Sequence, residues 1–134
     1  MDDQGLMRRF ETGEMPAGGF HHAQHVQVAW HYLGRAPLPE ALVCFTSGLK
    51  AFAAAQGATG LYHETITIAF MLVINERLAE DRDLDWPAFA AAHPELFTWK
   101  PSILDRYYLP ETHASERARR TFVMPDRLAA PSLS

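Results

Sequence analysis

The segment from Tyr62 to Glu80 most constrains the fold of this chain. Between Ile66 and Ile74 it is apolar on nearly every side, and it becomes charged toward Asp81. Its β-branched residues would also suit a strand, but the length of the pattern and the absence of Gly and Pro favour a helix. Because a helix that is apolar all round must be covered by other elements, we expect a central helix over 62–80.

Four further amphipathic helices are expected around this central helix. Their predicted ranges are 21–33, 39–56, 86–93 and 115–124. Asp85 is suited to cap the start of the third of these helices, and the last is expected to start at Ser115. Gly34 and Pro125 are expected to end the first and the last. The residues expected to face inward are Val26, Ala29, Trp30 and Leu33 in the first, Leu42, Phe45, Leu49 and Phe52 in the second, Trp86, Phe89 and Ala90 in the third, and Ala118, Phe122 and Val123 in the last.

The rest of the chain is expected to be irregular. Residues 1–20 are rich in Gly and Pro toward their end and form a predicted lead-in segment that packs over the bundle through Leu6, Met7 and Phe10. A turn or two is expected around Ile103 and Tyr108, and residues 125–134 form a tail without periodicity. At 134 residues the chain is long enough for one core. The predicted fold is an all-α, single-domain bundle of about five helices with irregular terminal segments.

Charge and cysteine content narrow the partners that we expect. The formal net charge of −4 disfavours nucleic-acid binding. The single cysteine, Cys44, cannot form an internal disulfide, and we expect it to be a small buried residue. The start of the chain does not resemble a signal peptide, and no apolar run approaches the roughly 20 residues that span a bilayer. We therefore expect a cytoplasmic protein with no membrane or nucleic-acid partner and with a small-molecule ligand as a possible partner.

Histidines at two predicted helix starts are the main indication of function. His22 and His25 lie three residues apart on the apolar stripe of the first helix, and His63 opens the central one. Side chains three apart in a helix are neighbours and can reach one ion. If the two helix starts meet, the sequence predicts a site for one divalent transition metal with His22, His25, His63 and Glu64 as ligands. Because zinc, nickel, copper and iron all accept imidazole, the pattern does not select among them.

Such a site would be consistent with an enzyme. Glu64 could be a metal ligand, an acceptor for an imidazole N–H, or a general base, and Thr67, one turn after His63, could orient that ring. A metal-bound water with a pKa lowered to about 7 would permit hydrolysis of a small molecule. Glu64, His63 and Thr67 are accordingly the predicted catalytic residues.

A second hypothesis is a non-catalytic helical module that binds a ligand or a protein partner and whose histidines are structural. A single histidine facing a core is more often hydrogen-bonded than bound to a metal. His21, four residues before His25, competes with His22 as a ligand but lies at the edge of the stripe, and His31 lies on the opposite face. A homodimer formed through aromatic residues is a further possibility. The aromatic residues considered for it are Trp86, Trp99 and Tyr107.

Four segments of the chain together resemble the sequence patterns of one protein family. Their sequences are Phe20-His21-His22-Ala23-Gln24-His25-Val26, Ala29-Trp30-His31-Tyr32-Leu33, Tyr62-His63-Glu64-Thr65-Ile66-Thr67 and Ala118-Arg119-Arg120-Thr121-Phe122-Val123-Met124-Pro125-Asp126. The chain resembles small uncharacterised bacterial proteins that share the patterns F-x-H-x-x-H-V, A-W-x-Y-L, Y-H-E-T-x-T and A-R-x-x-F-V-x-P-D. The resemblance favours His22 over His21 and associates His63, Glu64 and Thr67 with one site. It implies no activity.

Overall fold

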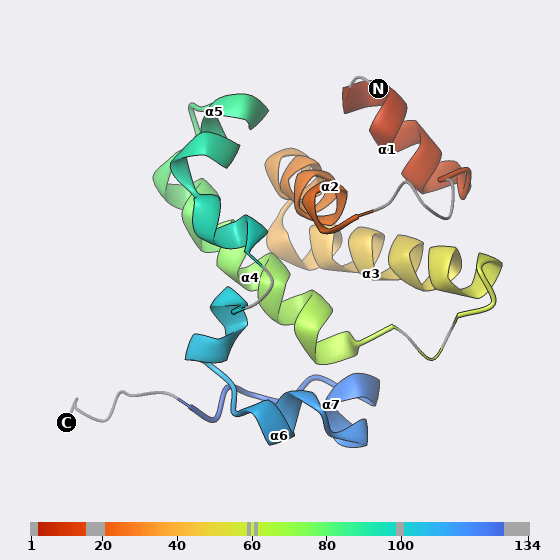
Figure 1. The fold of residues 1–134 in the computed structure, drawn as a ribbon. Helices are drawn as coiled ribbons and strands as arrows, with labels where there is room; N and C mark the ends of the chain where they lie inside the picture. The colour runs from red at the N-terminus through yellow and green to blue at the C-terminus, as the bar shows by residue number, and fades with distance from the viewer. Residues whose placement is uncertain (1–2, 16–20, 59, 61, 99–100, 128–134) are drawn as a thin grey trace.

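The computed structural model describes residues 3–15, 21–58, 60, 62–98 and 101–127, and these form an all-α fold without strands. Figure 1 shows the helices in chain order. They are α1 (Asp3–Thr12), α2 (His22–Arg35), α3 (Leu38–Ala55), α4 (Glu64–Glu80), α5 (Trp86–Ala92), the 3₁₀ helices η2 (Pro94–Phe97) and η3 (Ile103–Arg106), α6 (Pro110–His113) and α7 (Glu116–Arg120). The all-α prediction is confirmed; five of the seven α-helices have seven or more residues.

The central position of α4 is confirmed. It packs against α2, α3, α7 and η3, and α6 and α7 lie beneath its start, on the side away from α1 (Figure 1). Met71 and Ile74, in the middle of α4, are at most 1% exposed. Because elements cover α4 on several sides, its apolar circumference is buried, as the sequence predicts.

The N-terminal segment was expected to be irregular, and this expectation is wrong for residues 3–12, which form α1. Leu6, Met7 and Phe10 are buried, as predicted. The ring of Phe10 stacks on Phe45 of α3 with centroids 5.7 Å apart. Burial against α2 and α3 stabilises a helix whose other residues are mostly polar, because packing of one apolar face outweighs weak local propensity.

Two predicted helix ends also differ from the structure. Gly34 was expected to stop the first helix but lies inside α2, which ends at Arg35. At the C-terminus, the last helix begins beside Ser115, which caps it by accepting a hydrogen bond from Ala118 N, but α7 already ends at Arg120. The chain after α7 is non-helical because its backbone makes hydrogen bonds elsewhere: Asp126 N and Arg127 N both donate to Tyr107 O.

The short helix α5 is anchored to the end of α4 by a buried histidine. Asp85 caps α5, as predicted, and His93, at its end, is 8% exposed. The Nε2 atom of His93 lies 2.6 Å from a carboxylate oxygen of Asp81. Arg77 of α4 donates to Glu95 of η2 at 2.9 Å. Polar contacts therefore fix α5 and η2 to α4 alongside the apolar packing.

Helix α3 is unusual because it is apolar although few of its residues are buried. Among the described helices it alone is long and apolar enough, by length and composition, to cross a membrane; its 18 residues have a mean hydropathy of 1.2, and 11% of them are buried. Phe45 is buried and Leu49 half-buried, as predicted. Cys44 was expected to be buried and is exposed, because it is rotated by about 100° from Phe45 toward the outer face.

Candidate ligand-binding groove

The predicted histidines gather around two adjoining hollows between α2, α3 and α4. His22 and His25 line a small inner cavity, and His25 and His63 line a larger groove at the surface. The two helix starts therefore do come together, as the sequence hypothesis required. What the histidines do there is decided by their hydrogen bonds.

His22 is used to join α2 to η2. Its Nε2 lies 2.8 Å from the carbonyl oxygen of Leu96, so this nitrogen carries the proton and donates. Its ring packs edge-on against Phe70 with centroids 5.1 Å apart. Burial lowers the pKa of His22 below the ordinary value, although the hydrogen bond to Leu96 opposes that shift. His22 is therefore a neutral, half-buried hydrogen-bond donor at pH 7.

His63 was expected inside the helix, with its side chain on the core-facing stripe, but it is the N-cap of α4. Its Nδ1 accepts a hydrogen bond from Ile66 N at 3.1 Å, and its Nε2 donates to the carbonyl oxygen of His113 at 2.8 Å. The backbone at His63 is extended, which turns the ring back over the first turn of α4. Both ring nitrogens are consequently committed to protein backbone.

Glu64 and Thr67 also have partners close by. Tyr62 Oη donates to Glu64 at 2.6 Å, and Lys50 Nζ lies 3.7 Å from the same carboxylate. Thr67 donates to the carbonyl oxygen of His63 at 2.7 Å. Burial and the carboxylate of Glu64 raise the pKa of Tyr62 well above its ordinary value, so Tyr62 keeps its proton.

This donor set does not fit a metal ion. A ligating imidazole needs a nitrogen lone pair directed at the ion, but His63 uses one nitrogen as a helix cap and the other as a donor. In the part of the chain that the structure describes, no group of three or more His, Cys, Asp or Glu side chains is arranged to hold an ion. We therefore derive no reaction step through a metal at His22, His25, His63 and Glu64.

Thr65 is an important residue that the sequence analysis missed. It is fully buried; its hydroxyl donates to the carbonyl oxygen of Thr121 at 2.8 Å and accepts from Val123 N at 3.0 Å. These two hydrogen bonds hold the segment after α7 against α4. The sequence signal was a threonine in an apolar helix, which alone does not tell which distant backbone it will bind.

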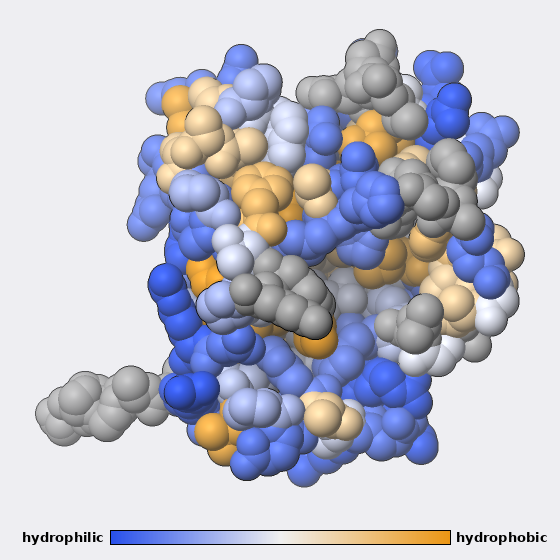
Figure 2. All heavy atoms as spheres, in the orientation of Figure 1, coloured by the Kyte–Doolittle hydropathy of each residue, from blue (hydrophilic) through white to orange (hydrophobic). Residues whose placement is uncertain are grey.

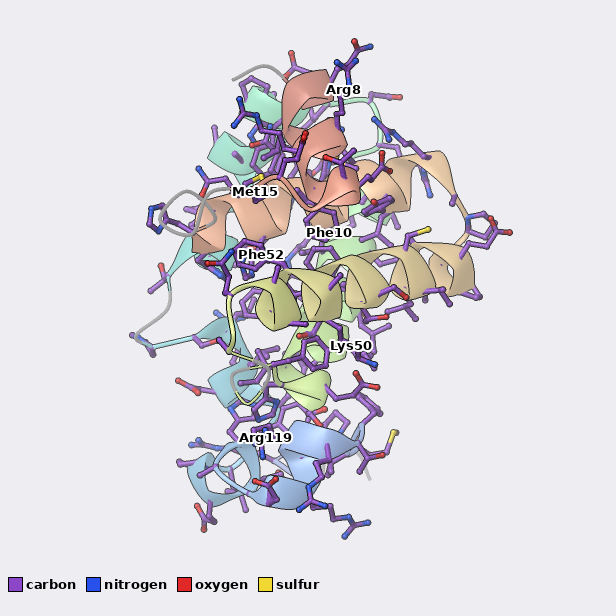
Figure 3. All side chains as sticks on the ribbon, turned by 90° about the vertical axis from the view of Figure 1, so that its right-hand side faces the viewer. Arg8, Phe10, Met15, Lys50, Phe52 and Arg119 are labelled. Atoms are coloured by element: carbon purple, nitrogen blue, oxygen red, sulfur yellow. The ribbon has the colours of Figure 1, made fainter. Side chains whose placement is uncertain are left out.

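The surface groove has the size and the lining of a small-ligand site. Its volume is about 510 Å³, within the range of about 300–1,000 Å³ that is usual for ligand pockets. Its apolar lining residues are Leu49, Phe52, Ala53, Ala58 and Ile66, and its polar ones are His25, Gln56, Tyr62, His63 and Thr67. Apolar surface covers the C-terminal end of α3 on the right of Figure 2, and Figure 3 places Lys50 and Phe52 on that helix.

The inner cavity lies directly behind this groove. Its volume is about 70 Å³, and among its lining residues are Ala29 of α2, Phe45 of α3, and Met71 and Ile74 of α4. Four side chains line both spaces and form the boundary between them; they are His25, Leu49, Ile66 and Thr67. A ligand in the groove would therefore lie one side chain away from the core of the bundle.

The aromatic residues proposed for a dimer have different surroundings. Trp86 is half-buried against Trp30, with ring centroids 5.5 Å apart, and Tyr107 is also half-buried. Trp99 lies outside the described residues. The dimer stays a prediction.

Comparison of the chain with protein-family models, with curated proteins and with solved structures found no match.

Proposed function

We propose that this protein is a non-catalytic helical module that binds a small, mainly apolar molecule in the groove between α3 and α4. The observation that carries the proposal is the groove itself, which is open to the surface, about 510 Å³ in volume and lined on one side by apolar residues of α3. Ligand pockets of this kind are mostly apolar with a few polar groups that fix orientation.

The histidines support a binding role rather than a reactive one. His22 and His63 hold backbone carbonyls of η2 and α6, at Leu96 and His113. These hydrogen bonds fix the start of α2 and the start of α4, the two helix ends beside the groove. A preformed wall lowers the entropic cost of ligand binding because less of the protein has to be ordered on binding.

The test uses an uncharged fluorescent probe, Nile red, whose emission increases in apolar surroundings. Ala53 lines the groove and is half-buried, whereas Ala54, its neighbour on α3, is exposed and lies outside the lining. We expect Ala53→Phe to fill the groove and weaken probe binding about tenfold or more, a loss of about 1.4 kcal/mol. Ala54→Phe adds the same side chain outside the groove and should leave the affinity unchanged.

Circular dichroism of both variants checks that the fold is retained. Equal weakening by the two substitutions, or no saturable binding of Nile red to the unaltered protein, would contradict the proposal.

A further inference from the structure

Accepting the proposed function, on which this inference rests, we infer that the ligand is a single linear hydrocarbon chain with an uncharged polar head, and that its tail crosses from the groove into the inner cavity. The chemical class is that of medium-chain alcohols and of compounds with similarly uncharged heads. Three observations support this inference: the two adjoining cavities, the four side chains between them, and a lining whose described residues include no Asp, Glu, Lys or Arg.

The linear shape follows from the size of the inner cavity. The volume of the inner cavity, about 70 Å³, is about a seventh of the groove's 510 Å³. The end of an extended chain therefore suits it better than a bulky ring system. The deepest lining, at Met71 and Ile74, is apolar and at most 1% exposed, which suits a terminal methyl group.

Side chains from three helices separate the two cavities. His25 of α2, Leu49 of α3, and Ile66 and Thr67 of α4 line both spaces. Leu49 and Ile66 are only partly buried against the core, so their side chains have room to change rotamer when a chain passes between them. The ligand would therefore be recognised by the width of its tail.

The prediction of an uncharged head follows from the residues that line the groove. No Asp, Glu, Lys or Arg is among the described residues that line it. The nearby cation Lys50 already lies 3.7 Å from Glu64, so a carboxylate head would meet that anion together with the cation. Gln56 lines the groove and can donate to a hydroxyl or a carbonyl oxygen, and Tyr62 Oη, whose proton is donated to Glu64, can accept from a hydroxyl. Burying a charged head without an ionic partner would cost more than burying a neutral one.

The experiment is displacement of Nile red by n-alkanols of increasing length. We expect the affinity to increase about three- to fourfold for each added methylene and to stop increasing at the length that fills both cavities. Alkanoates of equal length, and the bulky alcohol 1-adamantanol, are the comparison ligands, and both should bind more weakly than the matching n-alkanol.

Two variants locate the tail. Ala29 lines the inner cavity but not the groove, so Ala29→Val should shorten the optimal chain by about one or two methylenes while leaving short alkanols unaffected. Met71→Ala enlarges the same cavity and should lengthen the optimum. If either variant unfolds, the chain-length series on the unaltered protein still tests the inference.

The outcomes separate the two proposals. If Nile red binds and Ala53→Phe blocks it, but affinity does not depend on chain length or on Ala29→Val, the linear-chain inference is wrong and the groove function stands. Tighter binding of alkanoates than of alkanols would overturn the uncharged head. If neither Nile red nor any alkanol binds, the proposed function itself fails.

Discussion

At the scale of single residues, buried polar side chains of α4 connect distant segments. His63 and Thr65 occupy the cap and the first turn of α4, and each binds backbone about 50 residues away: His63 at His113, and Thr65 at Thr121 and Val123. A buried hydrogen bond contributes modestly to stability when it is formed, but an unsatisfied partner left behind is costly. These two side chains therefore help to fix the position of the C-terminal segment against α4.

Thr65→Val preserves the shape of the side chain and removes its hydroxyl. The free energy of unfolding should decrease by about 2 kcal/mol, because Val123 N–H and the Thr121 carbonyl lose their buried partner. Urea denaturation measures the change. Thr46→Val is the matched control, since the hydroxyl of Thr46 bonds back to Leu42 O and Val43 O within its own helix, and it should change stability by well under 1 kcal/mol. Equal effects of the two substitutions would contradict the role assigned to Thr65.

At the scale of helices, the docking of α1 on α3 depends on a glycine. A Cβ atom added at Gly48 would lie 2.6 Å from Cζ of Phe10 and closer still to Cε2, and Figure 3 shows Phe10 between α1 and α3. Phe10 is 3% exposed and stacks on Phe45, so its ring has little room to move. Glycine is tolerated inside α3 because it allows this ring to approach the helix backbone.

Gly48→Ala is expected to destabilise the protein although alanine is the better helix former. The gain in helix propensity is about 1 kcal/mol, and overpacking against a buried ring costs typically about 1–3 kcal/mol, so a net loss of about 1 kcal/mol should follow. Gly34→Ala in α2, where an added Cβ meets nothing within 4 Å, should instead stabilise by about 0.5 kcal/mol. Thermal denaturation of both variants compares them directly, and stabilisation by Gly48→Ala would contradict this account of α1 docking.

At the scale of the whole molecule, two half-buried histidines make stability depend on pH. Burial lowers the pKa of His22, and burial together with the neighbouring His63 lowers that of His113, both from the ordinary value of 6.5. The unfolded chain therefore binds protons below pH 6.5 that the folded chain does not bind. Their contribution to stability is complete above pH 6.5 and is lost as the pH decreases through the lowered pKa values of the folded state.

The free energy of unfolding should accordingly decrease from pH 7 toward pH 5, by at most about 1.4 kcal/mol per pH unit for each histidine. Asp126 contributes in a lower window, because the hydrogen bond from Thr112 lowers the pKa of that carboxyl below 3.8. His113→Gln should reduce the slope between pH 7 and pH 5, whereas His21→Gln, at an exposed position, should leave more of it intact. Urea denaturation across this range measures the slope, and an unchanged slope in His113→Gln would contradict the assignment.

The sequence by itself determined the all-α class, the central helix, and most of the inward faces. These follow from local periodicity. The segment from Ile66 to Ile74 is apolar around nearly the whole helix, and Phe45, Phe89 and Ala118 each belong to the apolar face of their own helix. It left open whether the starts of the first and the central helix meet. It missed α1, because the apolar face of α1 becomes favourable only when Phe10 packs over Gly48.

The tertiary structure decided what the histidines do. A three-residue spacing predicts that two imidazoles can reach one point, but it cannot show which backbone carbonyl lies nearer. In the folded chain, the carbonyl beside His22 belongs to Leu96, 74 residues away, and the carbonyl beside His63 belongs to His113, 50 residues away. The nitrogens of His22 and His63 bind those carbonyls because a buried polar group pairs with the partner that the fold places next to it, and that placement depends on contacts between distant parts of the chain.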